Sequence, residues 1–331
     1  MAKKVLLTQP IHKGGIELLQ DNGIQVEIAE KTDEAYLTQK ISECDGVIVR
    51  VTPMDRQLIA AAKKCVVIGR HGVGFDNVDI EAANEHNIPV VYAPGSNSNA
   101  VAEHTVALMF AVAKHIWGAN MNLRMKGNYG YRLQVVSTEL KGKTLGMIGL
   151  GNIGRRVATF CQKGLGMKII GYDPYIPAEL LAKEGLEVEL VSDLTYLLKN
   201  ADIVSLHMPG LSDKKKLIGK EELAMMKETA ILVNTARGVL IDEDALYEAL
   251  QTKKIAGAGL DVFDPEPPAA NNRLFEFANV VATPHMAAHT EEGNRNMAEI
   301  VAGNVLAVLK GEKPKNIANP DIWEKRRVCK N

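Results

Sequence analysis

Three polar side chains in the second half of the chain could do chemistry together. Each follows a short apolar run that predicts a buried strand, and they are Arg237, Glu266 and His285. An arginine fork can bind a carboxylate and polarise a keto oxygen, and a histidine can give that oxygen a proton. A nearby carboxylate stabilises the protonated form of such a histidine. Together these groups could support hydride transfer to a 2-keto acid.

Taken singly, each of these residues also has a structural interpretation. Arginine at a strand end is commonly a solvated cation. Glutamate between two prolines is commonly an acidic residue of a surface loop, and a lone histidine commonly has a structural role. A metal site is a further alternative, because His285 and His289 could share one face of a helix. However, Met286 stands where a zinc protease has its glutamate, and the Thr-Pro before His285 suggests a loop. We therefore predict no metal site.

A glycine-rich turn, Gly-Leu-Gly-Asn-Ile-Gly at 149–154, lies between a predicted strand and a predicted helix. The isolated pattern also occurs as a structural turn. In this context Gly149 permits the tight turn, Gly151 lets the backbone approach a phosphate, and Gly154 lets the helix pack on the strand. The N-terminus of the helix then offers free N–H groups to a pyrophosphate. The turn predicts a dinucleotide site.

Asp173 follows the next predicted strand, about 20 residues after the turn. A carboxylate at this position accepts hydrogen bonds from the ribose hydroxyls and repels a 2′-phosphate. Pro174 and Tyr175 follow it and bring no cation. The sequence therefore predicts NAD rather than NADP, and the alternative interpretation of Asp173 is a turn residue in Asp-Pro.

Short apolar runs alternate with helical patterns along the chain, which predicts parallel sheets with crossover helices. The first series of predicted strands covers residues 4–8, 25–29, 47–51, 66–69 and 89–92. The second covers residues 144–148, 168–172, 202–207, 230–234, 256–262 and 280–282. One long helix is predicted over 99–126 and a final helix from Thr290 to Leu309. The predicted fold class is α/β with two doubly wound units.

The composition of the chain is that of an ordinary globular protein. Of its 331 residues, 46% are hydrophobic and 24% are charged. The formal net charge of −1 provides no positive electrostatic potential that would attract nucleic acid or an anionic membrane. The apolar stretch 101–116 contains Glu103, His104, Lys114 and His115, which makes it a poor membrane span. The four cysteines form no Cys-x-x-Cys pair, and no signal-peptide pattern opens the chain. We expect a cytoplasmic protein that binds neither nucleic acid nor membrane.

Four ordered motifs resemble the NAD-dependent D-2-hydroxyacid dehydrogenases over essentially the whole chain. They are the glycine turn with Arg155-Arg156, Val-Asn-Thr-Ala-Arg-Gly (233–238), Gly-Leu-Asp-Val-Phe-Asp-Pro-Glu-Pro (259–267) and Thr-Pro-His (283–285). The resemblance implies reversible hydride transfer between NAD(H) and a D-2-hydroxy acid/2-keto acid pair. It also implies that Arg237 binds substrate, that His285 is the acid and base, and that Glu266 tunes this histidine.

The resemblance implies further contacts with the cofactor and the substrate. The implied cofactor-binding residues are Gly149, Gly151, Asn152, Ile153, Gly154, Asp173, Met208, Pro209, Thr235 and Asp261, the last on the nicotinamide side. The segment 69–79 is similar to the family's substrate loop, in which Val73 and Gly74 would offer backbone N–H groups to the substrate carboxylate.

The resemblance also implies domain boundaries and a homodimer. An NAD-binding domain at 101–288 would be inserted into a substrate-binding domain made of 1–100 and 289–331. The helical region at 101–126 is similar to the family's dimer contact. Its apolar residues could equally form an interdomain core.

The first half is most similar to the phosphoglycerate dehydrogenases, which implies that Arg50 meets the anionic far end of a substrate such as 3-phosphoglycerate. Those enzymes usually carry a second Lys or Arg shortly afterwards, where Thr52-Pro-Met54 stands here. Hydroxypyruvate and glyoxylate are therefore alternative substrates. We expect no feedback by serine, because no regulatory extension follows Asn331. A non-catalytic, NAD-sensing corepressor is the alternative of another class.

Overall fold

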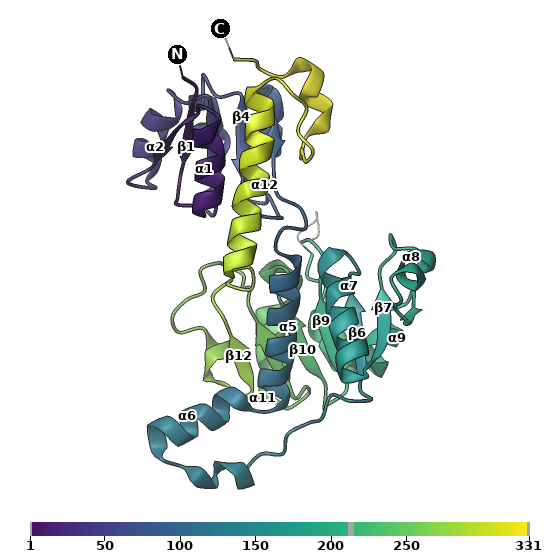
Figure 1. The fold of residues 1–331 in the computed structure, drawn as a ribbon. Coiled ribbons are helices and arrows are strands. Elements are labelled where there is room, and N and C mark those ends of the chain that lie inside the picture. The colour runs from purple at the N-terminus through teal and green to yellow at the C-terminus, as the bar shows by residue number, and fades with distance from the viewer. Residues whose placement is uncertain (1, 211–214, 330–331) are drawn as a thin grey trace. The chain divides into compact units, whose positions relative to one another are not determined.

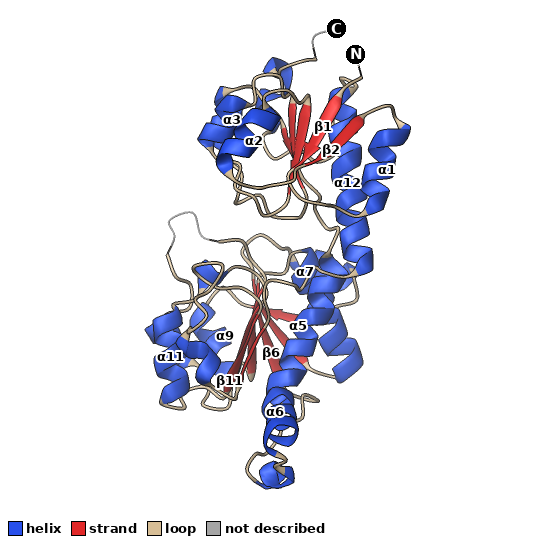
Figure 2. Ribbon diagram, turned by 90° about the vertical axis from the view of Figure 1, so that its left-hand side faces the viewer, coloured by secondary structure: helices blue, strands red, loops and turns tan. Residues whose placement is uncertain are grey.

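The computed structural model describes residues 2–210 and 215–329. The chain divides into two compact units, one formed by residues 1–97 and 289–331 and the other by residues 98–288 (Figure 1). Each unit has a parallel sheet with helices on both of its faces (Figure 2). The predicted fold class, α/β with two doubly wound units, is confirmed.

The sheet of the first unit has the strand order β2-β1-β3-β4-β5. Its strands are β1 (Lys4–Leu7), β2 (Gln25–Ile28), β3 (Gly46–Val49), β4 (Val67–Arg70) and β5 (Val90–Val91). The chain moves outward from β1 to β2 and then to the other side at β3, so the topological switch point lies between β1 and β3. Its helices are α1 (Lys13–Asp21), α2 (Glu34–Ile41), α3 (Arg56–Ala61), α4 (Ile80–Glu85), α12 (Glu291–Leu309) and the short 3-10 helix η5 (Pro320–Lys325).

The C-terminal helix α12 completes the core of the first unit. Thr290 caps it by accepting a hydrogen bond from the N–H of Gly293 at 2.9 Å, as the sequence predicts. The helix lies directly on β4, because a Cβ added at Gly69 would stand 2.7 Å from a methyl of Val305. Val305 is fully buried in this contact. The two parts of the sequence that form the first unit therefore share one hydrophobic core.

The sheet of the second unit has the strand order β12-β11-β10-β9-β6-β7-β8. Its strands are β6 (Thr144–Ile148), β7 (Lys168–Tyr172), β8 (Val188–Leu190), β9 (Ile203–Leu206), β10 (Ile231–Asn234), β11 (Gly257–Leu260) and β12 (Val280–Ala282). The order reverses between β6 and β9, which makes this pair the switch point of the second sheet. Ligands of doubly wound folds bind beyond the carboxyl ends of the strands at such a point.

The helices of the second unit cover both faces of its sheet. They are α5 (Ser98–Ala113), α6 (Ile116–Lys126), α7 (Asn152–Thr159), α8 (Ala178–Lys183), α9 (Leu194–Asn200), α10 (Lys220–Met225) and α11 (Glu243–Gln251). Shorter helical turns are η1 (Tyr129–Leu133), η2 (Phe160–Gly164), η3 (Gly238–Leu240) and η4 (Arg273–Glu276). Among the described residues, no helix combines the length and apolar character needed to cross a membrane.

Two elements differ from the sequence predictions. The single helix predicted over 99–126 is two helices, because His115 adopts a left-handed conformation with φ +51° and ends the run. Most of α5 is buried, whereas Gly118 is the buried residue of α6. The edge strand β8 was not predicted, since Glu187 and Glu189 alternate with apolar residues there and leave only a weak apolar signal.

Candidate active site

The glycine turn lies at the switch point of the second sheet, between the end of β6 and the start of α7. Gly149 has φ +95°, and a Cβ there would stand 2.5 Å from the carbonyl oxygen of His207, which follows β9. A Cβ at Gly154 would stand 2.2 Å from the carbonyl oxygen of Gly149. These two positions therefore require glycine for the close packing of turn, helix and neighbouring strand.

Gly151 differs from the other two glycines because a Cβ there would meet nothing within 4 Å. Gly151 is also the N-cap residue of α7, and no side chain caps the helix. No N-cap side chain therefore occupies the N–H groups of the first turn of α7, which begins with Asn152 and Ile153. An open backbone with free donors fits the pyrophosphate of a dinucleotide.

Asp173 directly follows β7, and its carboxylate has two partners in the main chain. One oxygen accepts from the N–H of Leu150 at 2.7 Å and the other from the N–H of Tyr175 at 2.9 Å. The second bond is the Asx turn of the alternative interpretation, and the first ties Asp173 to the glycine turn. Each carboxylate oxygen has a second lone pair, so ribose hydroxyls remain possible partners.

The other residues assigned to the cofactor lie after β9, β10 and β11. Met208 is half-buried and Pro209 is exposed in the segment after β9. Thr235 follows β10, and its hydroxyl lies 2.8 Å from that of Thr105 on α5. Their cofactor contacts stay predictions.

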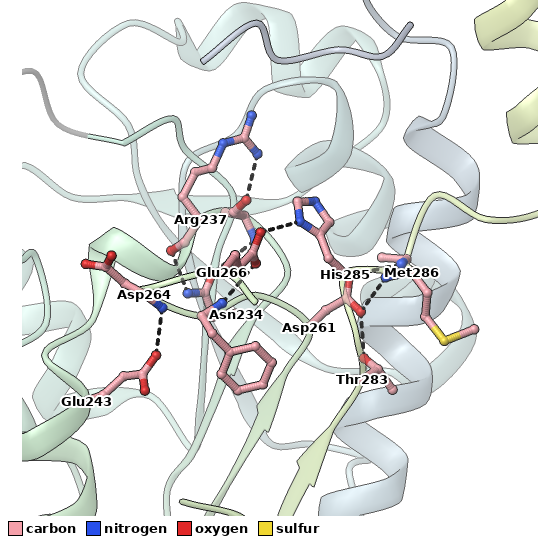
Figure 3. A network of polar contacts seen from close by, with 12 residues as sticks. Asn234, Arg237, Glu243, Asp261, Asp264, Glu266, Thr283, His285 and Met286 are labelled. Carbon is pink, nitrogen blue, oxygen red and sulfur yellow. Dashed lines mark hydrogen bonds and ion pairs between the residues drawn. The ribbon is translucent and has the colours of Figure 1, made fainter. Parts of the chain in front are cut away.

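Asp261 follows β11, is fully buried and holds the segment that carries His285 (Figure 3). One carboxylate oxygen accepts from the hydroxyl of Thr283 at 2.6 Å and from the N–H of Met286 at 2.9 Å. The other oxygen accepts from the N–H of Ala287 at 2.9 Å. These three bonds make Asp261 a support of the histidine segment, a role that the sequence prediction did not include.

His285 and Glu266 form a hydrogen-bonded pair. Nδ1 of His285 lies 2.8 Å from Oε2 of Glu266, and Oε1 of Glu266 accepts from the N–H of Phe263 at 3.0 Å. The carboxylate can only accept, so Nδ1 carries a proton and Nε2 is the nitrogen left for a substrate. The side chain of His285 is 53% exposed, which leaves Nε2 accessible.

The electrostatic environment keeps Glu266 ionised. Burial by itself would raise the pKa of this carboxyl, but the hydrogen bond and charge of His285, the N–H of Phe263 and the charge of Arg237 together lower the pKa below its usual value. A carboxylate that stays charged near neutral pH stabilises a positive charge on the imidazole.

Arg237 enters the same region from the loop after β10. The buried side chain of Asn234 shapes this loop, since its amide donates to the carbonyl of Arg237 at 2.8 Å and its oxygen accepts from the N–H of Ala236 at 2.9 Å. The loop lies close to the Glu266 loop, because a Cβ at Gly238 would stand 1.9 Å from the carbonyl oxygen of Phe263. The structure thus brings Arg237, Glu266 and His285 to one end of the sheet (Figure 3).

Sequence reasoning missed two residues that position this group. Asn234 closes the apolar run of β10, and a polar residue in a buried strand is a signal that could have identified it. His104 lies on α5, with Nε2 3.0 Å from the hydroxyl of Thr283 and 3.5 Å from Asp261. From the sequence, the polar residues of this otherwise apolar helix were read only as evidence against a membrane span, so His104 was not predicted as a site residue.

The predicted substrate residues of the first unit follow two neighbouring strands. Arg50 comes directly after β3 and donates to the carbonyl of Pro10 at 2.9 Å. Val73 and Gly74 lie in the loop after β4, and both are partly exposed. The side chain of Asn77 holds the Arg50 loop by donating to the carbonyls of Arg50 at 3.1 Å and Thr52 at 2.8 Å. Their substrate contacts stay predictions.

Over residues 2–210 and 215–329, no cluster of three or more His, Cys, Asp or Glu side chains has the arrangement of a metal site. His285 and His289 are therefore not part of a group of three or more such side chains in the described residues.

Comparisons with known proteins agree on one family. Residues 106–287 match the family described as D-isomer specific 2-hydroxyacid dehydrogenase, NAD binding domain. The chain is 46% identical to D-3-phosphoglycerate dehydrogenase of Methanocaldococcus jannaschii over 98% of its own length but 61% of that protein. It is 40% identical to glyoxylate reductase of Thermococcus litoralis, covering 97% of this chain and 98% of the relative.

Solved structures give the same result. The NAD-bound 3-phosphoglycerate dehydrogenase of Entamoeba histolytica is similar with a TM-score of 0.81 and 30% identity, covering 96% of this chain and 99% of that one. This resemblance includes both units.

We expect Asp261→Asn to weaken the histidine segment. An amide has one acceptor oxygen, so the buried N–H of Met286 or Ala287 would lose its partner, at a cost of about 1–3 kcal/mol. Urea unfolding should show this loss, and binding of an NADH-competitive ligand should weaken less than turnover. Asp264→Asn is the matched control, because Asp264 pairs with Lys216 near the surface and such pairs contribute about 0–1 kcal/mol. Equal stability of the two variants would contradict the prediction.

Proposed function

The chain belongs to the D-isomer specific 2-hydroxyacid dehydrogenase family, and from that premise we propose that it transfers hydride between NAD(H) and a D-2-hydroxy acid/2-keto acid pair. The observation that carries this proposal is the hydrogen-bonded pair of Glu266 and His285, with Arg237 nearby, in the unit that holds the family's NAD-binding domain. We propose residues 101–288 as the NAD-binding domain and residues 1–100 with 289–331 as the substrate-binding domain.

Two side chains would act directly on the substrate. Arg237 binds the carboxylate of the 2-keto acid and polarises its keto oxygen. His285 donates the proton on Nε2 to that oxygen as the carbonyl carbon becomes a C–H centre. Bound NADH supplies the hydride for that carbon. The reaction therefore consumes one 2-keto acid, one NADH and one proton, and yields one D-2-hydroxy acid and one NAD⁺.

Glu266 and Asp261 prepare His285 for this step. Glu266 fixes Nδ1–H, so the proton that is exchanged sits on Nε2, and its negative charge stabilises the imidazolium before transfer. After transfer the neutral ring keeps its hydrogen bond to Glu266. Asp261 holds the segment in place through its three hydrogen bonds and lies on the nicotinamide side of the proposed site.

The proposed NAD contacts combine backbone donors with one selective carboxylate. The turn 149–154 would bind the pyrophosphate, and Asp173 would bind the adenosine ribose. Met208, Pro209 and Thr235 would line the rest of the dinucleotide. In the first unit, Val73 and Gly74 would donate to the substrate carboxylate and Arg50 would meet the far end of the substrate. Their partly exposed positions after β4 and β3 support this assignment.

The relatives include two kinds of enzyme that carry out this reaction, phosphoglycerate dehydrogenases and glyoxylate reductases. The phosphoglycerate dehydrogenases are longer than this chain, which spans 61% of the M. jannaschii protein, and the T. litoralis glyoxylate reductase matches it end to end. We propose a short 2-keto acid as the substrate, with phosphohydroxypyruvate, hydroxypyruvate and glyoxylate as the candidates.

Removal of His285 tests the proposed reaction. We expect His285→Ala to lower kcat by about 10²–10⁴ with each active 2-keto acid, because the proton donor is lost, while NADH still binds with unchanged fluorescence enhancement. His289→Ala is the control, since this exposed histidine lies outside the Glu266 pair. Binding of NADH without turnover of any 2-keto acid by the unaltered protein would instead favour an NAD-sensing protein.

Replacement of Glu266 tests its electrostatic role through pH. The pKa of Glu266 is lowered, so its carboxylate is ionised throughout the neutral range and supports the protonated histidine there. Glu266→Gln removes that charge, and the pH above which reduction of the 2-keto acid fails should move to a lower value. A pH profile of kcat for the reductive reaction measures this. An unshifted alkaline limb would show that Glu266 only orients the ring.

In this proposal, the preference for NADH over NADPH depends on the negative charge of Asp173. Asp173→Asn removes the negative charge that repels a 2′-phosphate, and we expect the NADH-to-NADPH ratio of kcat/KM to fall at least about tenfold, equivalent to roughly 1.4 kcal/mol. Asp193→Asn removes an equal charge from the same unit, at a residue that also accepts from a main-chain N–H two positions on. A ratio unchanged by Asp173→Asn would assign that residue to the turn alone.

We further propose a cytoplasmic homodimer. The side chains of Trp117, Met125 and Leu133 in α6 and η1 are 48%, 72% and 85% exposed, which is unusual for large apolar groups on a free surface. All four cysteines are free thiols, which suits a reducing compartment. Sedimentation equilibrium should give twice the mass of the chain, and Trp117→Glu with Met125→Glu should give the monomer. A monomeric unaltered protein would contradict this part of the proposal.

A further inference from the structure

One residue of the glycine turn, Leu150, has a partner for its side chain, its N–H and its carbonyl. The side chain is fully buried in the core of the second unit, where a Cβ added at Gly171 would stand 2.7 Å from one of its methyl groups. The N–H donates to Oδ2 of Asp173 at 2.7 Å, and the carbonyl accepts from Nη1 of Arg155 at 2.9 Å. The peptide groups on both sides of Leu150 are therefore fixed by charged side chains.

The guanidinium of Arg155 is itself held through all three of its nitrogens. Nη1 donates to the carbonyl of Leu150, and Nε lies 3.1 Å from Oε1 and 3.0 Å from Oε2 of Glu184. Nη2 donates to the side chain of Asn152 at 3.3 Å. Arg155 lies on α7 and Glu184 is the C-cap residue of α8, so this group joins two helices to the turn. A planar guanidinium with partners at each nitrogen has one preferred orientation.

The pair of Arg155 and Glu184 is more suited to holding a peptide group than to attracting an anion. The side chain of Arg155 is 16% exposed, and that of Glu184 is 40% exposed. The carboxylate neutralises the guanidinium at hydrogen-bonding distance, so the pair adds little net charge beside the turn. Its effect on a bound phosphate would therefore come from the geometry that it imposes on the main chain.

The orientation of the Leu150 carbonyl decides the orientation of the next N–H. The cis peptide bonds of the described residues precede Pro265 and Pro267, so the bond between Leu150 and Gly151 is trans. The C=O and N–H groups of a planar trans peptide point in opposite directions. Because the carbonyl is directed at Arg155, the N–H of Gly151 points away from that side chain.

The N–H of Gly151 has the properties of a donor that is kept for a ligand. None of the hydrogen bonds between described residues uses this N–H, although the carbonyl of Gly151 accepts from the N–H of Arg155 at 3.0 Å. The space beside the residue is open, because a Cβ there would meet nothing within 4 Å. An anionic oxygen could accept from this donor without displacing a protein group.

We infer that Arg155, held by Glu184, is a positioning residue for the pyrophosphate of NAD. It fixes the peptide between Leu150 and Gly151 so that the N–H of Gly151 is presented to a phosphate oxygen. The inference rests on the proposed function, in which the turn 149–154 binds the pyrophosphate, and adds a residue that prepares this contact. Asp173 holds the N–H of Leu150, so the same residue links the proposed ribose contact to the proposed pyrophosphate contact.

Binding of NADH, followed by its fluorescence enhancement and by calorimetry, tests this role without turnover. We expect Arg155→Met, which keeps most of the length of the side chain but none of its donors, to raise the Kd of NADH about tenfold, equivalent to roughly 1.4 kcal/mol. Arg155→Lys keeps one donor for the carbonyl of Leu150 and should give a smaller rise. A defect in folding alone would lower the number of binding sites in the titration, but it would leave the Kd of the folded molecules unchanged.

Arg156→Met is the matched control, because it removes the same charge from the next position of α7. Arg156 is exposed and donates to the side chain of Asn99 at 2.6 Å and to the carbonyl of Asn152 at 3.2 Å, rather than to Leu150. This variant should change the Kd of NADH by less than about twofold, since that corresponds to only a few tenths of the free energy of a tenfold change.

Glu184→Ala separates orientation from charge, because the two effects have opposite signs. If the positive charge of Arg155 attracted the pyrophosphate, loss of its neutralising carboxylate would tighten the binding of NADH. If Glu184 acts by holding Arg155, the same change should weaken the binding, and it should add nothing in the Arg155→Met background. Salt gives a second check, since the effect of Arg155→Met should persist in about 0.5 M NaCl, where interactions between exposed charges are screened.

The outcomes separate this inference from the function on which it rests. An unchanged Kd in Arg155→Met, equal effects of Arg155→Met and Arg156→Met, tighter binding by Glu184→Ala, or an effect that disappears at high salt would each overturn the inference. All four leave the proposed dehydrogenase function intact. Failure of the unaltered protein to bind NADH would contradict that function, and the inference would fall with it.

Discussion

The carboxylate of Asp261 is fully buried, and its three hydrogen bonds hold the segment from Thr283 to Ala287. His285 lies inside this segment with φ +49°, a conformation that costs a residue other than glycine about 1–3 kcal/mol. The bonds to Asp261 on either side keep the segment in that conformation. The ring lies 2.8 Å from Glu266, so the geometry proposed for proton transfer depends on a residue that need not touch the transferred proton.

The parallel sheets explain why such distant residues meet. Arg237, Glu266 and His285 follow β10, β11 and β12, which are neighbours in the second sheet, and parallel strands deliver their carboxyl ends to one edge. The glycine turn lies at the same edge, between β6 and β9. In the first sheet the same rule gathers His12, Arg50 and His71 around one cavity. A single topological rule thus forms both groups of polar side chains.

The charges around the histidine distinguish the polar group of the second unit from that of the first unit. Near Arg237 the ionised Glu266 forms a hydrogen bond of 2.8 Å with the ring of His285. In the first unit, burial and then the charges of Arg50 and Arg70 lower the pKa of His71 to about 4, so its ring is neutral at physiological pH. The same residue type is therefore hydrogen-bonded to a carboxylate in one unit and kept neutral by burial in the other.

The sequence by itself determined the fold class and the strands after which Arg237, Glu266 and His285 lie, because apolar periodicity and glycine spacing are local signals. It also determined α12 and its Thr290 cap. Only the tertiary structure revealed the break at His115, the edge strand β8, the clamp by Asp261 and the contacts of Asn234 and His104. These features depend on which groups meet across strands far apart in sequence, and on the burial that decides whether a polar atom finds a partner. Spacing along the chain carries neither kind of information.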